Sequence, residues 1–166
     1  MSATKKVSFK ELLHYFPKVD LPITLGEHTH HNFSESNEPL PLALVTHFFE
    51  PLHKEEIDEH TEFIPGFLLP DTFGFVAMVY WKASLMNYQH ILLTTTEKGE
   101  YIDHRVIAGS AFDSETVVQS VATITPDWEV VIVSGASGGG NNMDAQQTTV
   151  RHLELLPEGA IQELED

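Results

Sequence analysis

The chain has 166 residues, of which 25 are Asp or Glu and 9 are Lys or Arg, so its formal net charge at pH 7 is −16. A field of that sign repels nucleic-acid phosphates and anionic lipids, so we expect no nucleic-acid partner and no membrane partner. The absence of cysteine excludes disulfides, thiolate nucleophiles and cysteine-bound metal centres.

The length predicts a single domain over residues 1–166. Within it we expect disorder over 1–6, a cover of helices and loops over 7–62, and a β-meander over 63–166. The N-terminus lacks the apolar core of a signal peptide, and no run reaches the roughly 20 apolar residues of a membrane span. These features predict a cytoplasmic protein.

Two short helices are predicted before residue 50. Ser8 and Glu11 have the spacing of a capping box, which favours a helix over residues 8–16. A second helix is predicted over Leu42–Phe49, since the proline before it suits a first helical turn. The stretch 28–38 is polar and has no hydrophobic period, so it is predicted to be a loop.

The rest of the chain is organised around a run of apolar residues, Phe73–Lys82, that is apolar on both alternating faces. Such a run is typical of a strand buried on both sides. Short apolar segments separated by turn residues follow it to the C-terminus. Phe63–Leu69 adds one more strand, and Pro65 within it indicates an edge or a bulge. Gly109–Glu115 and the glycine-rich 134–142 are predicted to be loops.

The sequence therefore predicts a mainly β fold, an antiparallel up-and-down meander of seven to eight strands with two short N-terminal helices. A barrel-like closure and a strongly bent open sheet both remain compatible with this pattern. Eight strands in up-and-down order permit a barrel with room for one small ligand.

Histidines are concentrated in one polar segment, where His28, His30 and His31 lie within four residues. Neutral imidazoles bind zinc and nickel well, and alternating histidines on an extended segment point the same way. These three residues are therefore the candidate metal ligands. Because their spacing matches no established motif, a polar loop that is merely rich in histidine is the alternative.

The predicted strands carry polar and aromatic side chains that could line a cavity. The candidate ligand-binding residues are Tyr80, Tyr101, His104 and Arg105. Strict alternation places Tyr101, Asp103 and Arg105 on one face of their strand. Asp103 and Arg105 are expected to pair on a wet face, or to bind a polar group if that face lines the interior.

Three stretches carry a resemblance to a known family: Phe75–Ala83, Tyr88–Thr95 and the return from Gly99 to Gly109. They resemble a small bacterial family of uncharacterised domains, from about Asp20 to the end of the chain. No activity is attached to that family, so the resemblance implies no site residue. The strand pattern is also similar to that of calycin-type barrels, but the chain lacks their Gly-x-Trp signature near its start.

No catalytic triad, cofactor motif or metal motif of known spacing occurs in the sequence. We therefore expect a non-catalytic binding or interaction module, without a cofactor, whose target is a small ligand or a protein partner. The alternative is a metal-dependent enzyme that uses a divalent ion such as zinc at residues 28–31. The edge strand Phe63–Leu69 also predicts a homodimer formed by strand pairing.

Overall fold

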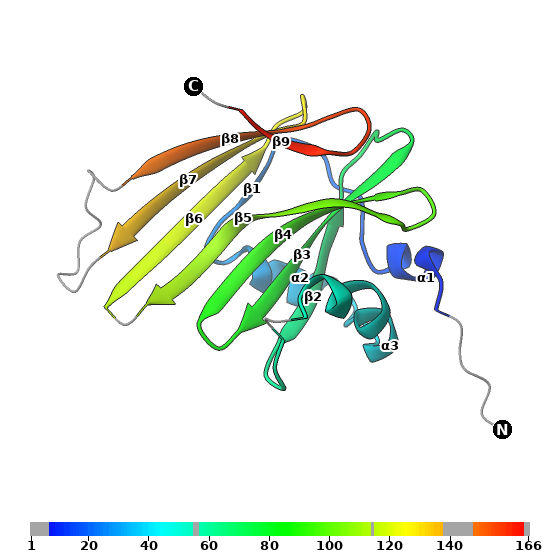
Figure 1. Cartoon of the computed structure of the whole chain (residues 1–166), viewed down its shortest axis with the longest axis horizontal. Helices are drawn as coiled ribbons and strands as arrows, with labels where there is room; N and C mark the ends of the chain where they lie inside the picture. Colours follow the sequence, from blue (N-terminus) through cyan, green and yellow to red (C-terminus); the bar gives the residue numbers. More distant parts are fainter. Residues whose placement is uncertain (1–6, 55–56, 114, 138–147, 165–166) are drawn as a thin grey trace.

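The computed structural model describes residues 7–54, 57–113, 115–137 and 148–164. It contains one strongly twisted antiparallel sheet with short helices packed at one end (Figure 1). The strands are β1 (Ile23–Leu25), β2 (Glu62–Leu68), β3 (Phe75–Ser84), β4 (Asn87–Thr96), β5 (Tyr101–Asp113), β6 (Thr116–Ile124), β7 (Glu129–Ser137), β8 (Thr149–Leu155) and β9 (Ile161–Leu164).

The sheet confirms the predicted up-and-down meander. From β2 to β9, each strand pairs with the next strand along the chain, and β1 pairs separately with β6. In the described part of the chain β2 and β9 form the two ends of this path and do not pair with each other. The sheet is therefore open rather than closed into a barrel.

Strand β3 is buried on both faces, as its continuous apolar sequence predicts. Four alternating residues belong to one apolar cluster, which extends to β6–β9: Phe75, Ala77, Val79 and Trp81. Met78 and Tyr80, which point the other way, belong to a second cluster. Two separate cores therefore meet at this strand.

The helices divide between these two cores. They are α1 (Phe9–His14), α2 (Thr29–Ser36), α3 (Leu42–Leu44), a π-helical turn η1 (Val45–Phe49) and a 3₁₀ turn η2 (Glu50–Leu52). Leu12 of α1, Leu44 of α3 and Phe49 of η1 pack in the second cluster, whereas Phe33 of α2 packs in the first. Among the described residues no helix has the length and apolar character needed to span a bilayer.

The start of α1 agrees with the predicted capping box. The Ser8 hydroxyl accepts a hydrogen bond from the backbone N–H of Glu11 at 3.1 Å. This bond satisfies one of the free N–H groups of the first helical turn. The helix ends at His14, slightly before the predicted boundary.

The prediction of a loop over residues 28–38 is wrong, because α2 occupies most of it. The helix has one buried apolar residue, Phe33, whose ring lies 5.9 Å from that of Phe67. A single apolar anchor produces no hydrophobic period, so pattern analysis does not detect the helix. Its tertiary contact with the sheet supplies the stability that the pattern lacks.

Strand β2 is the predicted bulged edge strand, with a shift of register between Pro65 and Phe67. The Asn37 side-chain amide donates to the carbonyl oxygens of Pro65 and Gly66 at 2.7 and 3.0 Å. The Leu68 N–H donates to the Pro17 carbonyl at 2.8 Å. Part of this edge is thus covered by the chain itself, and a homodimer through strand pairing stays a prediction.

The predicted loop over Gly109–Glu115 is also wrong, because β5 continues through Gly109 to Asp113. Gly109 has φ +137°, and a Cβ there would lie 1.8 Å from the Tyr88 carbonyl oxygen. Only glycine fits this close approach, which is how a strand interior tolerates it. Strand β7 likewise runs to Ser137, and the remainder of the glycine-rich stretch, 138–142, lies outside the described residues.

Candidate functional site

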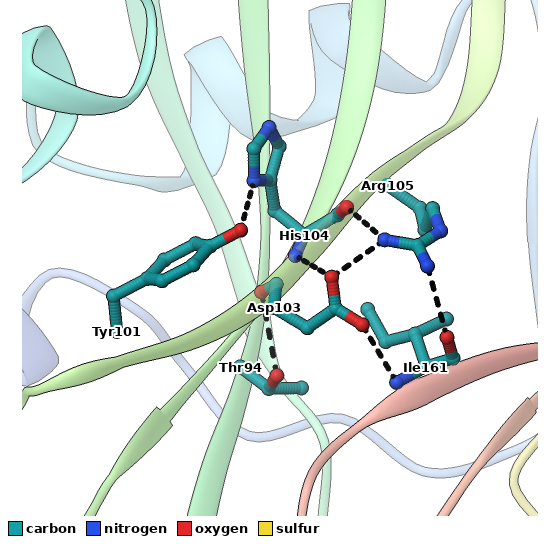
Figure 2. Close-up of polar contacts among 6 residues, drawn as sticks. All are labelled: Thr94, Tyr101, Asp103, His104, Arg105 and Ile161. Atoms are coloured by element: carbon teal, nitrogen blue, oxygen red, sulfur yellow. Dashed lines mark hydrogen bonds and ion pairs between the residues drawn. The ribbon is translucent and has the colours of Figure 1, made fainter.

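The strand residues chosen from the sequence as ligand contacts are hydrogen-bonded to other groups of the same chain. The Tyr101 hydroxyl and His104 Nδ1 lie 2.9 Å apart (Figure 2). Tyr80 is fully buried and its hydroxyl lies 2.6 Å from His53 Nε2. Each of these polar groups therefore has a partner within the chain.

Asp103 and Arg105 form a clasp between β5 and the terminal strand β9 (Figure 2). One oxygen of Asp103 accepts hydrogen bonds from Arg105 and from the His104 N–H, and the other accepts from the Ile161 N–H at 3.0 Å. Arg105 Nη2 donates to the Ile161 carbonyl at 3.1 Å. Two side chains thus bind the backbone of β9 as a neighbouring strand would.

The predicted shared face of Tyr101, Asp103 and Arg105 is wrong. Thr94 pairs with Asp103 but Thr95 pairs with Tyr101, so the register shifts and one residue of β5 is left over. Such a bulge reverses the alternation of side chains on one side of it. Tyr101 consequently faces His104 while Asp103 and Arg105 contact β9.

A concave site lies in another part of the molecule, between α2 and one end of strands β2–β5. This pocket has a volume of about 550 Å³. Its aromatic wall consists of Trp81, Tyr88 and Phe112, and its imidazole wall consists of His28, His30 and His31. Two carboxylates, Glu27 and Glu62, also line it. All three predicted metal-ligand candidates are therefore part of this pocket.

The rings of the pocket are stacked in an ordered series. His30 lies flat on Trp81, with ring centroids 4.3 Å apart and planes 9° apart. Trp81 is in turn parallel to Tyr88, with centroids 5.9 Å apart. Phe112 meets Tyr88 edge-on, at 5.7 Å and 86°. Tyr88 and Phe112 thus form a right-angled aromatic corner, and each is 38 % exposed.

A further histidine, His90, lies behind the aromatic wall. Its ring centroid is 4.7 Å from that of Trp81, and only 1 % of the residue is exposed. Among the described residues neither ring nitrogen of His90, nor Nδ1 of His30, has a hydrogen-bond partner. Buried polar atoms almost always have partners, so these three atoms mark the pocket region as exceptional.

Burial keeps both imidazoles neutral. It lowers the pKa of His90 to about 3, and the nearby His30 contributes to the same effect. The pKa of His30 is lowered by burial and then by the neighbouring His31 and His28, against a backbone hydrogen bond with Glu27. His30 in the pocket and His90 behind it are therefore neutral at pH 7.

The three clustered histidines meet through their ring faces. The centroids of His30 and His31 lie 4.0 Å apart, and His28 stacks on His31 at 5.9 Å. Metal ligation needs ring nitrogens that converge on one point, which stacking does not provide. In the ranges that the structure describes, no group of three or more His, Asp or Glu side chains is placed to hold a metal ion.

Tyr88 and Phe112 were not predicted from the sequence to be site residues. Phe112 falls in a stretch that was predicted to be a loop, whereas Trp81 was among the strand side chains that could line a cavity. Period-two alternation does relate Trp81 to Ala83, and both line the pocket. No sequence signal relates these strand residues to the histidines of residues 28–31. The two segments are far apart in the sequence and come together only when the chain folds.

Comparison with known proteins adds no functional assignment: no family model, no curated protein and no solved structure matches this chain.

Proposed function

We propose that the protein is a non-catalytic binding module that takes a small ligand in the pocket between α2 and strands β2–β5. The observation that carries this proposal is the aromatic corner of Tyr88 and Phe112 at a pocket of about 550 Å³. A volume of this size is typical of small-molecule sites, as is a wall of aromatic side chains with a few polar groups. The cytoplasmic location predicted from the sequence remains part of this proposal.

The exposure of the two corner residues supports a ligand rather than a purely structural role. Tyr88 and Phe112 stay partly exposed, although both belong to strands and could be covered by neighbouring chain. Trp81, by contrast, is only 6 % exposed and is held between His30 and the sheet. The pocket thus combines a fixed indole with two accessible rings, which suits ligand contact without large rearrangement.

A fragment screen by ligand-observed NMR tests the proposal. We expect several fragments to bind the native chain and to lose binding in Phe112→Ala. The matched control is Phe73→Ala, because Phe73 is 81 % exposed and lies outside this pocket. Added chelator should leave the binding unchanged, since the proposal requires no metal.

Two outcomes would contradict the proposal. Either no fragment binds the native chain, or the fragments that bind do so equally well to Phe112→Ala and Phe73→Ala. Binding that disappears with chelator and returns with zinc would instead favour the metal-dependent alternative at His28, His30 and His31.

A further inference from the structure

The charges around the pocket indicate which ligands it prefers. Among its lining residues, Glu27 and Glu62 are acidic, and no lysine or arginine is present. The whole chain adds a net charge of −16. Both the local and the overall field therefore repel anionic ligands and attract cations.

The aromatic corner provides the complementary recognition surface. Tyr88 and Phe112 present rings at 86° to each other, so a group placed in the corner contacts one ring face and a second ring at once. Aromatic faces carry negative electrostatic potential and attract alkylated ammonium groups, which are weakly hydrated. Trp81, parallel to Tyr88, extends the aromatic wall towards α2.

The ring of His30 is the third element of the pocket wall. His30 lies on the indole with its Nδ1 buried and without a partner among the described residues. Because burial lowers its pKa, His30 adds polar atoms to the wall without the positive charge that would repel a cation. A carboxylate on β2 then lies on the same pocket as aromatic rings from β3, β4 and β5.

Resting on the proposed function, we propose that this pocket binds a small organic cation with an alkylated ammonium group, held by the Tyr88–Phe112 corner and attracted by Glu62. The ammonium head contacts the two rings, and its positive charge is balanced by the carboxylates of Glu62 and Glu27. The recognition is by charge and shape and requires no chemical step.

A matched pair of probes tests the ligand class directly. Choline and 3,3-dimethylbutan-1-ol have the same shape, but the first carries a positive nitrogen where the second carries a neutral carbon. Isothermal titration or NMR titration of the native chain should give an affinity for choline roughly tenfold or more above that for the neutral alcohol. Raising the salt concentration should narrow this difference, because screening weakens the attraction.

Variants then assign the effect to the proposed residues. Glu62→Gln should weaken choline binding several-fold and leave binding of the neutral alcohol unchanged. Glu35→Gln is the control. It also removes one negative charge, but from an exposed residue of α2 that lies outside the pocket. Phe112→Ala should weaken binding of both probes.

The possible results separate the two proposals. Equal binding of both probes, lost in Phe112→Ala, would overturn the cation preference while leaving a ligand pocket in place. Equal effects of Glu62→Gln and Glu35→Gln would show that only overall charge matters, and would overturn the assignment to Glu62. If neither probe binds while the fragment screen yields neutral or anionic ligands, the cation proposal fails alone. If no fragment binds either, both proposals fail.

Discussion

The clasp at Asp103 and Arg105 and the ring cluster at His30 and His90 use polar side chains in opposite ways. In the clasp, the oxygens of Asp103 are bonded to Arg105 and to backbone N–H groups. In the ring cluster, Nδ1 of His30 and both ring nitrogens of His90 have no partner among the described residues. Partnered polar groups hold a fold together, whereas unpartnered buried ones cost stability and call for another explanation.

The two regions are carried partly by the same strand. Asp103 and Arg105 of β5 form the clasp, and Ser110 and Phe112 of the same strand line the pocket. Gly109 lies between the clasp residues and the pocket residues, where β5 passes close to the backbone of β4. Changes along this one strand therefore separate the contribution of the clasp from that of the pocket.

The largest effect is expected at the junction itself. Gly109→Ala places a methyl group against the Tyr88 carbonyl in a backbone conformation that alanine rarely adopts. We expect a loss of about 4 kcal/mol in the free energy of unfolding, measured by urea titration. Gly26→Ala is the control, because a Cβ there meets nothing within 4 Å. Similar stability of the two variants would show that β4 and β5 separate easily.

The clasp is expected to come next. Asp103→Ala leaves the Ile161 and His104 N–H groups without their carboxylate acceptor and removes the ion-pair partner of Arg105, so we expect a loss of about 3 kcal/mol in stability. Asp20→Ala, at an exposed residue, should change stability by less than about 0.5 kcal/mol. In Asp103→Ala the backbone amides of β9 should exchange hydrogen faster than in the native chain. A loss below about 1 kcal/mol would mean that the clasp contributes little to docking β9.

The ring cluster should make stability sensitive to acid. In the folded chain the pKa of His90 is about 3, against 6.5 for an unperturbed histidine. The unfolded chain therefore binds more protons between these values, and stability falls as the pH drops below 6.5. Between pH 7 and pH 5 we expect a loss of about 2 kcal/mol from this residue. Denaturant midpoints at several pH values measure this loss of stability. In His90→Leu most of the dependence of stability on pH should disappear.

The smallest change is expected from His90→Leu at neutral pH. Replacing a buried, unpartnered imidazole by an apolar side chain removes a desolvation cost, so we expect a stability within about 1 kcal/mol of the native chain. The same substitution in the clasp, Arg105→Leu, should cost more, because it breaks contacts with Asp103 and Ile161. If His90→Leu is the more damaging of the two, the imidazole of His90 makes a stabilising polar contact in the folded chain.

Local patterns were sufficient to predict much of the fold. The continuous apolar run at β3, the proline-marked bulge of β2 and the Ser8 cap of α1 each follow from residues within one segment. The helix α2 could not be predicted this way, because its one apolar anchor gains its stability from Phe67, far along the chain. The extension of β5 through Gly109 was missed because glycine there reports a close backbone approach rather than a turn.

The candidate site was predictable only in part. The histidine-rich segment does line the pocket, but it was predicted from the sequence to be a polar loop with candidate metal ligands rather than a helix with stacked imidazoles. Its partners Trp81 and Tyr88 come from strands, and only the fold places them against the imidazoles. The residues chosen as ligand contacts, Tyr101 and Arg105, are instead bonded to their neighbours after the bulge in β5 changes their orientation.

The pairing of β1 with β6 has a consequence for how the chain is made. Thr24 and Thr123, whose hydroxyls lie 3.0 Å apart across this pair, are separated by 99 positions in the sequence. During synthesis β1 emerges from the ribosome long before β6 has been made. Closing so long a loop is entropically costly. Strand β1 can therefore complete its pairing only after residues 122–124 of β6 have been synthesised. Since α2 follows β1 directly but packs on Phe67 of β2, we expect the imidazole wall to form without waiting for β6.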